Sequence, residues 1–426
     1  MTLIKMRRKL IVFLMIFNSL SVVSQKQADN WIFGTWAGLN FSTGDPVSFI
    51  PNHNPTGGFS GTVMSDSSGN LLFYFDGARV WNRNGDIMLN GDGILPEHNA
   101  HMSQVAFEKP GSDLQYYIFS VPQRLYPGAM YYSVIDMSLD NGLGGITDQK
   151  NIIIGATFPV AAQLFALKNK AGDGYWVISH LLNSDRYISI RVDANGVDHE
   201  PVYSGPCVYR DVSTIGHGPV KVSPDKKHLV ACYWTSGLGP LDNFEVCTFD
   251  AETGYIDYSY YVARQWTGPP SYSTPSGCEF SPDSRYLYMA YMNIDTYSGS
   301  ALFQFDMQYV DDSAAFVGSE VLIRGNSGHR VQLSNDGKIY TDCLADSCGP
   351  PYNGYISVIN KPWEQGIACD FDTLSVYLGG RTTSHWLVNI LLDYLYRFEW
   401  EGDQCQFSPI TFKPNFRPVP DSVRWF

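Results

Sequence analysis

The sequence is short of charged residues, which make up only 17% of the chain, and it contains no basic tract. Its formal net charge is −13 at pH 7. Nucleic acids and anionic membranes attract clustered Lys and Arg side chains, so neither is an expected partner. Beyond the N-terminus, the sequence also lacks long segments with helical apolar spacing and runs of about 20 apolar residues that could span a bilayer. These absences argue against a helical protein and against a transmembrane segment.

Signatures of catalytic and metal sites are also missing. In Gly58-Phe-Ser-Gly-Thr62 a Thr stands where a nucleophile elbow has its second Gly, and the segment lies between two predicted strands. Asp193-Ala-Asn-Gly-Val-Asp198 lacks the downstream Glu and the flanking helices of a calcium hand, so we predict a hairpin turn there. No Gly-rich phosphate loop joins a strand to a helix. We therefore expect no cofactor, no metal and no catalytic residues.

Gly, Pro and aromatic residues are abundant, which is typical of a turn-rich all-β protein. A strand–turn–strand motif recurs along the chain. Its turns resemble Ser281-Pro-Asp-Ser284, in which Pro presets φ and the Asp and Ser side chains bond to nearby backbone. The clear copies are residues 220–232, 278–291 and 331–340, and the weaker ones are 63–74, 107–118 and 167–176. A repeat of this size indicates a propeller or a solenoid.

Alignment of these hairpins places the first strand of each unit near residues 60, 103, 161, 218, 276, 330 and 386. The fourth and fifth units each hold four apolar runs, and four-stranded antiparallel sheets repeated radially form a β-propeller. We predict an all-β, seven-bladed propeller over residues 29–395. In this prediction the last blade is shared by three N-terminal strands and one C-terminal strand beginning at His385; the N-terminal strands are residues 31–34, 38–42 and 46–50.

The N-terminus has the features of a secretory signal peptide. Four basic residues between Lys5 and Lys9 precede the apolar run Leu10–Leu20, and the small residues Val22-Val-Ser24 precede Gln25. The apolar run is too short for a membrane anchor. We predict a signal peptide at residues 1–24, and therefore a secreted or cell-surface protein whose ligand is outside the cell.

Exported proteins commonly form disulfides, and the sequence has eight Cys. Cys343 and Cys348 are close enough in sequence to bridge one loop. Cys232 and Cys247 lie on consecutive predicted strands and could face each other across a hairpin. Alternatively, the strand Cys residues are buried apolar side chains. Their spacing does not resemble that of a zinc ribbon.

Four His residues occupy one repeated position, in the loop that enters the innermost strand of a predicted blade: His101, His217, His329 and His385. Imidazoles around one mouth of the channel could bind a transition metal or an anionic ligand. Blades 2, 4 and 6 are not adjacent, however, and metal ligands must lie within about 2 Å of the ion. We therefore favour the alternative, in which each His satisfies backbone groups at the rim.

Loops on the same predicted face are rich in aromatic residues and Arg. Such side chains form carbohydrate and peptide sites, although long loops can also cover a blade with no ligand at all. The candidate ligand-binding residues are Arg210, Asp211, Arg264, Trp266, Tyr272 and Arg381, together with the four His residues.

Several motifs, in a fixed order, resemble a family of secreted propeller proteins from gliding, Bacteroidetes-type bacteria. They are Asn30-Trp-Ile-Phe-Gly-Thr-Trp-Ala-Gly-Leu-Asn-Phe-Ser-Thr-Gly44, Ser67-Ser-Gly-Asn-Leu-Leu-Phe-Tyr-Phe-Asp-Gly77, Val80-Trp-Asn-Arg-Asn84 and Ile359-Asn-Lys-Pro362. The resemblance implies polycystic-kidney-disease-type (PKD-type), immunoglobulin-like domains after the propeller, and often a sorting domain for type IX secretion, which is missing here. Residues 396–426 are similar to the first strands of a PKD-type domain. About 30 residues are too few for a sandwich of about 100, so we predict an incomplete segment.

These observations favour a non-catalytic binding or adhesion module, expected to be monomeric, that recognises a glycan or protein through the loops at the channel mouth. One alternative is a propeller hydrolase or lyase acting on extracellular polysaccharide or peptide. It would need two carboxylates about 5 to 10 Å apart across the channel, and Glu97 and Asp211 are isolated in sequence. A further alternative is a structural spacer, which would have neither a pocket nor clustered aromatic residues at the mouth.

Overall fold

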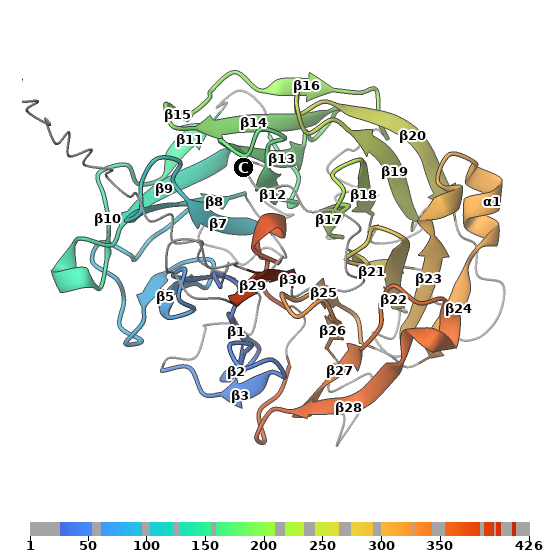
Figure 1. Cartoon of the computed structure of the whole chain (residues 1–426). Helices are drawn as coiled ribbons and strands as arrows, with labels where there is room; N and C mark the ends of the chain where they lie inside the picture. Colours follow the sequence, from blue (N-terminus) through green and yellow to red (C-terminus); the bar gives the residue numbers. More distant parts are fainter. Residues whose placement is uncertain are drawn as a thin grey trace, which may run out of the picture.

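The computed structural model describes residues 26–52, 61–95, 103–121, 128–154, 159–208, 218–233, 243–263, 274–292, 300–325, 328–342, 354–383, 387–395, 398–401 and 411–414. Seven small antiparallel sheets stand around a central axis as the blades of a propeller (Figure 1). The predicted all-β, seven-bladed fold is therefore confirmed. We number the blades from the first hairpin repeat, so that the N-terminal strands form blade 7.

The first three blades contain short strands in chain order. Blade 1 has β4 (Thr62–Ser65), β5 (Leu71–Phe75) and β6 (Val80–Asn82). Blade 2 has β7 (Gln104–Glu108), β8 (Gln115–Ser120) and β9 (Met130–Asp136), with both β10 (Gly145–Ile146) and β11 (Ile152–Ile154) paired to β9. Blade 3 has β12 (Phe165–Lys168), β13 (Tyr175–His180) and β14 (Tyr187–Asp193), with β15 (Gly196–Val197) and β16 (Val202–Ser204) paired to β14.

Each of the next three blades has four strands. Blade 4 is β17 (Val220–Val222), β18 (His228–Cys232), β19 (Asn243–Phe249) and β20 (Ile256–Ala263). Blade 5 is β21 (Thr274–Phe280), β22 (Tyr286–Met292), β23 (Ser300–Asp306) and β24 (Val321–Gly325). Blade 6 is β25 (Val331–Leu333), β26 (Ile339–Thr341), β27 (Tyr355–Ile359) and β28 (Phe371–Tyr377). Blades 4 and 5 have four strands each, as the four apolar runs of the fourth and fifth units predicted.

The few helical turns lie outside the sheets. They are the short helix α1 (Ser313–Gly318) and the 3-10 turns η1 (Asp140–Gly142), η2 (Met307–Tyr309), η4 (Gly366–Cys369) and η5 (Leu392–Leu395). The Asp312 side chain caps α1 by accepting from the backbone N–H of Ala314 and Ala315. No helix of the described residues has the length and apolar character needed to span a membrane.

The repeated hairpin turns share one backbone feature, which explains their sequence. In the three clear copies the fourth residue of the turn has a left-handed φ, which is +59° at Lys226, +62° at Ser284 and +79° at Gly337. The side chain of the first or third residue holds the turn, as when Ser281 Oγ donates to Asp283 and accepts from the Tyr286 N–H. Asp193 and Gly196 also pair across a hairpin turn, as predicted.

Ring closure differs from the prediction. Blade 7 contains β1 (Asn30–Phe33), β2 (Ala37–Asn40) and β3 (Val47–Phe49), and no described C-terminal strand adds to it. A bridge between Thr35 and Thr382 joins it to the chain after blade 6. The described part of the expected fourth strand, residues 387–395, instead enters the central channel. A run of apolar residues predicts burial, and burial in a channel satisfies it as well as burial in a sheet.

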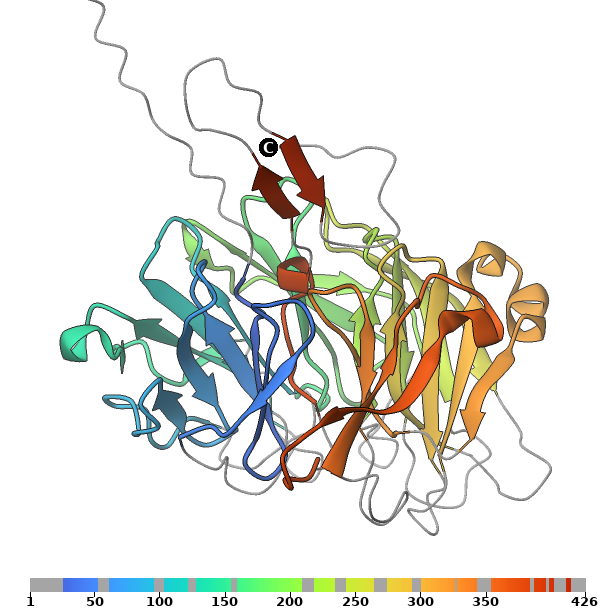
Figure 2. The same cartoon turned by 60° about the horizontal axis from the view of Figure 1, so that its bottom comes forward.

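Two predictions concern the segments before and after the propeller. The predicted signal peptide lies outside the described residues. Beyond the propeller, β29 (Phe398–Glu401) and β30 (Thr411–Pro414) form a two-stranded sheet to one side of the ring (Figure 2). The assignment of residues 396–426 to an incomplete PKD-type segment remains a prediction.

Candidate functional site

The ring has two unlike faces. The turn face carries the tight hairpins that follow the innermost strands, such as 66–70, 223–227 and 281–285. The loop face carries the connections that enter those strands and the ones that join second to third strands. These loop-face connections are longer; residues 342–354, for example, join β26 to β27.

Most of the predicted ligand-binding residues belong to loop-face connections and lie outside the described residues. These are Arg210, Asp211, Arg264, Trp266, Tyr272, His101, His217 and His385, and the same holds for the predicted disulfide Cys343–Cys348. Their roles remain predictions. His329 and Arg381 can be placed.

His329 lies two residues before β25 and is buried, with only 1% of its surface exposed. Its backbone N–H donates to Asp342 Oδ1 at 3.1 Å. Arg381 is half-buried, and its guanidinium donates to the Leu378 carbonyl at 2.9 Å, within its own turn after β28. Arg381 thus contributes to holding the chain as it leaves blade 6.

Next to His329, the structure shows a buried charged pair that sequence reasoning missed. Arg330 and Asp342 flank β25 and β26, and Asp342 Oδ1 accepts from the Arg330 backbone N–H at 2.7 Å. Burial lowers the pKa of Arg330 to about 9, against the opposing effect of the Asp342 carboxylate. Burial raises the pKa of Asp342 to about 6, with Arg330 opposing the shift. The alternation of apolar and polar residues in these strands did not predict this pair, because Arg330 lies just before β25 and Asp342 just after β26.

The innermost strands of blades 4, 5 and 6 also contribute polar side chains to the channel. Lys221 Nζ lies 2.9 Å from Glu279 Oε2 and 2.9 Å from Gln332 Oε1, and each side chain of the ion pair is only 3% exposed. Glu279 also accepts from the backbone N–H groups of Phe280 and Leu333. This network fixes the register of three neighbouring blades.

A third buried polar group links blades 3 and 4 near the loop face. The Tyr187 hydroxyl donates to Glu245, whose other carboxylate oxygen accepts from the Val208 N–H at 3.2 Å. The His180 ring lies edge-on to Tyr187, with ring centroids 4.6 Å apart. All three side chains are fully buried. Buried polar side chains therefore lie beneath the loop-face ends of blades 3, 4 and 6.

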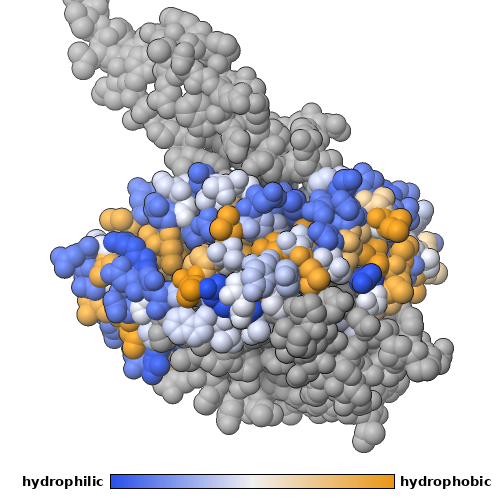
Figure 3. All heavy atoms as spheres, turned by 90° about the horizontal axis from the view of Figure 1, so that it is seen from below, coloured by the Kyte–Doolittle hydropathy of each residue, from blue (hydrophilic) through white to orange (hydrophobic). Residues whose placement is uncertain are grey.

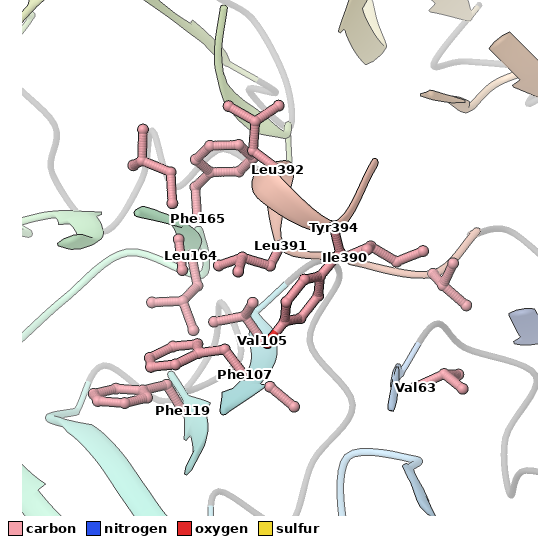
Figure 4. Close-up of a cluster of buried hydrophobic side chains, with 14 of the residues drawn as sticks. Val63, Val105, Phe107, Phe119, Leu164, Phe165, Ile390, Leu391, Leu392 and Tyr394 are labelled. Atoms are coloured by element: carbon pink, nitrogen blue, oxygen red, sulfur yellow. The ribbon is translucent and has the colours of Figure 1, made fainter. Parts of the chain in front are cut away.

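The segment 387–395 fills the channel between blades 1 to 4. At the loop-face end, Asn389 Nδ2 donates to the carbonyl groups of Gln104 and Leu164. At the turn-face end, Asp393 accepts from the Lys168 N–H and from Lys226 Nζ at 2.7 Å. Between these ends, Ile390, Leu391 and Leu392 lie against the side chains of innermost strands, including Val105 and Phe165 (Figure 4). The channel is therefore packed along this side.

On the turn face, a shallow hollow of about 390 Å³ lies between blades 3 and 4, lined by Asn169, Lys170, Ala171, Asp173, Arg191 and Glu252. Lys170 and Glu252 form an ion pair across it at 2.8 Å, and each is 68% exposed. Since no aromatic residue lines this hollow, it lacks the platforms typical of a carbohydrate site.

The predicted Cys232–Cys247 disulfide is wrong. In the β18–β19 register Leu229 faces Cys247, whereas Cys232 faces Phe244. The two Cys are thus offset by three residues, which puts about 10 Å between them along the strands and points them to opposite faces of the sheet. Within the described ranges, no three His, Cys, Asp or Glu side chains gather as a metal site.

The fold defines a seven-bladed β-propeller. No family model and no curated protein matches the chain. Among solved structures, a putative 6-phosphogluconolactonase from Bacteroides uniformis is 12% identical, with a TM-score of 0.42 over 84% of this chain and 99% of its own. A protein from Lactobacillus plantarum is 11% identical, with a TM-score of 0.46 over 84% and 98%. Kuenenia stuttgartiensis hydrazine synthase is 14% identical, with a TM-score of 0.40 over 78% and 86%. Similarity at this level says nothing about the function of this chain.

Proposed function

We propose that the protein is a secreted or cell-surface, non-catalytic recognition module that binds a glycan or protein ligand on its loop face. The observation that carries this proposal is that side chains fill the central channel. Residues 387–395 fill one side of the channel, and the Lys221–Glu279 pair occupies the other. A ligand would then bind at the mouth rather than inside.

The turn face is the weaker candidate for recognition. Its hairpins satisfy their own polar groups, as when Asp66 Oδ1 accepts from the Ser68 and Asn70 N–H groups. Long loop-face connections, rich in Trp, Tyr and Arg, supply the side chains that glycan and peptide sites use. Binding sites are commonly found on long loops held by a rigid scaffold.

The test is a glycan and peptide array probed with the full chain and with two double variants. Arg264→Ala with Trp266→Ala alters a loop-face connection, whereas Lys170→Ala with Glu252→Ala alters the turn face. We expect the first variant to lose binding and the second to keep it. The opposite result would move the site to the turn face.

Two further outcomes decide between the remaining classes of function. If no arrayed ligand binds, the chain is better explained as a structural spacer. Turnover of a bound polysaccharide or peptide would contradict the non-catalytic proposal and favour a hydrolase or lyase. Export is tested separately, by N-terminal sequencing of secreted protein, which we expect to begin at Gln25.

A further inference from the structure

Two buried thiols from neighbouring blades meet beneath the loop face. Cys232 is the last residue of β18 in blade 4, Cys278 lies in β21 of blade 5, and neither has exposed surface. The Pro219 carbonyl oxygen accepts from the Cys232 N–H at 3.0 Å and lies 4.0 Å from Cys278 Sγ. Pro219 and Cys232 face each other at the end of the β17–β18 pairing. The Cys278 sulfur therefore reaches this pair from the next blade.

The contacts around the two thiols hold blades 4 and 5 in a fixed register. The Lys221–Glu279 ion pair joins β17 to β21 only one residue from Cys278 along the chain. Gln163 from blade 3 donates to the Cys232 carbonyl at 2.9 Å, which fixes Cys232 from the other side. Both thiols belong to one apolar cluster with Phe244 and other side chains of blades 4 and 5. Burial raises the pKa of the Cys278 thiol, and its hydrogen bond with Cys232 raises it further.

We propose that Cys232 and Cys278 form a disulfide that joins blades 4 and 5. One thiolate attacks a disulfide oxidant, such as glutathione disulfide or a thiol–disulfide oxidoreductase, and gives a mixed disulfide. The second thiolate then attacks that sulfur, so that the Sγ–Sγ bond forms and the oxidant leaves as a thiol. Two protons and two electrons leave the pair, and the oxidant is reduced to two thiols.

The burial of both sulfurs determines when this reaction takes place. In the folded protein an oxidant has no access to either buried sulfur, and the raised pKa of the Cys278 thiol leaves little of it as the reactive thiolate. The bond therefore forms during folding, before blades 4 and 5 have packed together and buried the two sulfurs. The same burial protects the finished bond from reductants. This pairing is independent of ligand binding and can be tested whether or not the loop face binds a glycan.

The test is a disulfide map of the full, unaltered chain. The protein is unfolded with reductant, refolded in a glutathione redox buffer, and then denatured in iodoacetamide so that free thiols are alkylated. Digestion without reduction uses trypsin and a glutamyl endopeptidase, because cleavage after Glu245 separates Cys232 from Cys247. We expect a cross-linked peptide pair that contains unalkylated Cys232 and Cys278.

Two variants make the map specific. Cys247→Ala should keep the cross-link, and Cys278→Ala should lose it and leave Cys232 alkylated. Complete alkylation of Cys232 and Cys278 in the refolded, unaltered chain would overturn the proposal. A cross-link from Cys232 to any other Cys would overturn it as well. Since the decisive map uses the unaltered chain, the outcome does not depend on whether a variant folds.

Discussion

The buried Lys221–Glu279 pair gives a quantitative test of how the blades are held in register. In Lys221→Met the side chain of Glu279 remains buried without its counter-charge. Removing one partner of a buried ion pair typically costs about 3–5 kcal/mol. This is a large part of the roughly 5–15 kcal/mol by which folded proteins are stable, so we expect a clear fall in the free energy of unfolding.

A second substitution should reverse most of this loss. In Lys221→Met with Glu279→Gln, neither position carries a buried charge, and the Gln carbonyl can still accept from the Phe280 or Leu333 N–H. We expect the double variant to lie within about 2 kcal/mol of the unaltered protein, since neutral replacements of buried pairs are often tolerated. Urea unfolding followed by Trp fluorescence gives both values.

The exposed Lys170–Glu252 pair is the matched control, because its geometry is similar and both side chains are 68% exposed. Water and salt screen such a pair, so Lys170→Met should leave the unfolding midpoint unchanged within error. The reasoning is refuted if Lys170→Met and Lys221→Met shift the midpoint equally. It is also refuted if the Lys221→Met, Glu279→Gln variant is less stable than Lys221→Met alone.

Three further perturbations test other parts of the structure. The raised pKa of Asp342, about 6, stabilises the fold below pH 4, and this contribution is lost as pH rises through 6. The stability of the unaltered protein relative to Asp342→Asn should therefore fall between pH 4 and 7, and a constant difference would contradict this account. Leu391→Ala should cost about 2–5 kcal/mol in urea unfolding, whereas Ile367→Ala, at a side chain that is 99% exposed, should change stability by less than about 0.5 kcal/mol. Gly337→Ala forces a φ of +79° on a residue with Cβ, and we expect a loss of about 1–2 kcal/mol in the same assay; an unchanged midpoint would mean that this turn relaxes.

The blades could be predicted because their information is local. Each hairpin has its strands and its turn within 10 to 14 residues, as in 278–291, and the structure pairs Phe280 with Leu287 as that motif requires. Repetition of one motif then gives the number of blades. Local sequence does not determine the position of residues 387–395, because that position depends on the space left in the channel by the other blades.

The buried polar groups were missed for a related reason. Lys221 occupies an inward position of a short strand, and the sequence alone could not show that Glu279 and Gln332 from two other blades lie beside it. The pairing of Cys232 failed in the same way. Its neighbour on the consecutive strand was the obvious candidate, whereas the thiol that it contacts, Cys278, belongs to the next blade.

The outer rim of the ring is a weaker candidate for a binding surface than the loop face. Figure 3 shows hydrophobic areas on the described rim separated by hydrophilic ones. Exposed apolar side chains there come from the outermost strands or from turns, and include Val47, Leu322, Ile367 and Tyr377. Scattered apolar residues are normal on a protein surface.

The C-terminal segment leaves the propeller on the face opposite to the one where we propose that a ligand binds. This segment enters the channel beside the starts of the innermost strands, where Asn389 binds, and leaves beside their ends, where Asp393 and Tyr394 bind. The following β29–β30 sheet lies on that exit side of the ring (Figure 2). The chain thus leaves the propeller on the turn face. A segment attached there would hold the propeller by its turn face and leave the loop face, the proposed binding face, on the opposite side.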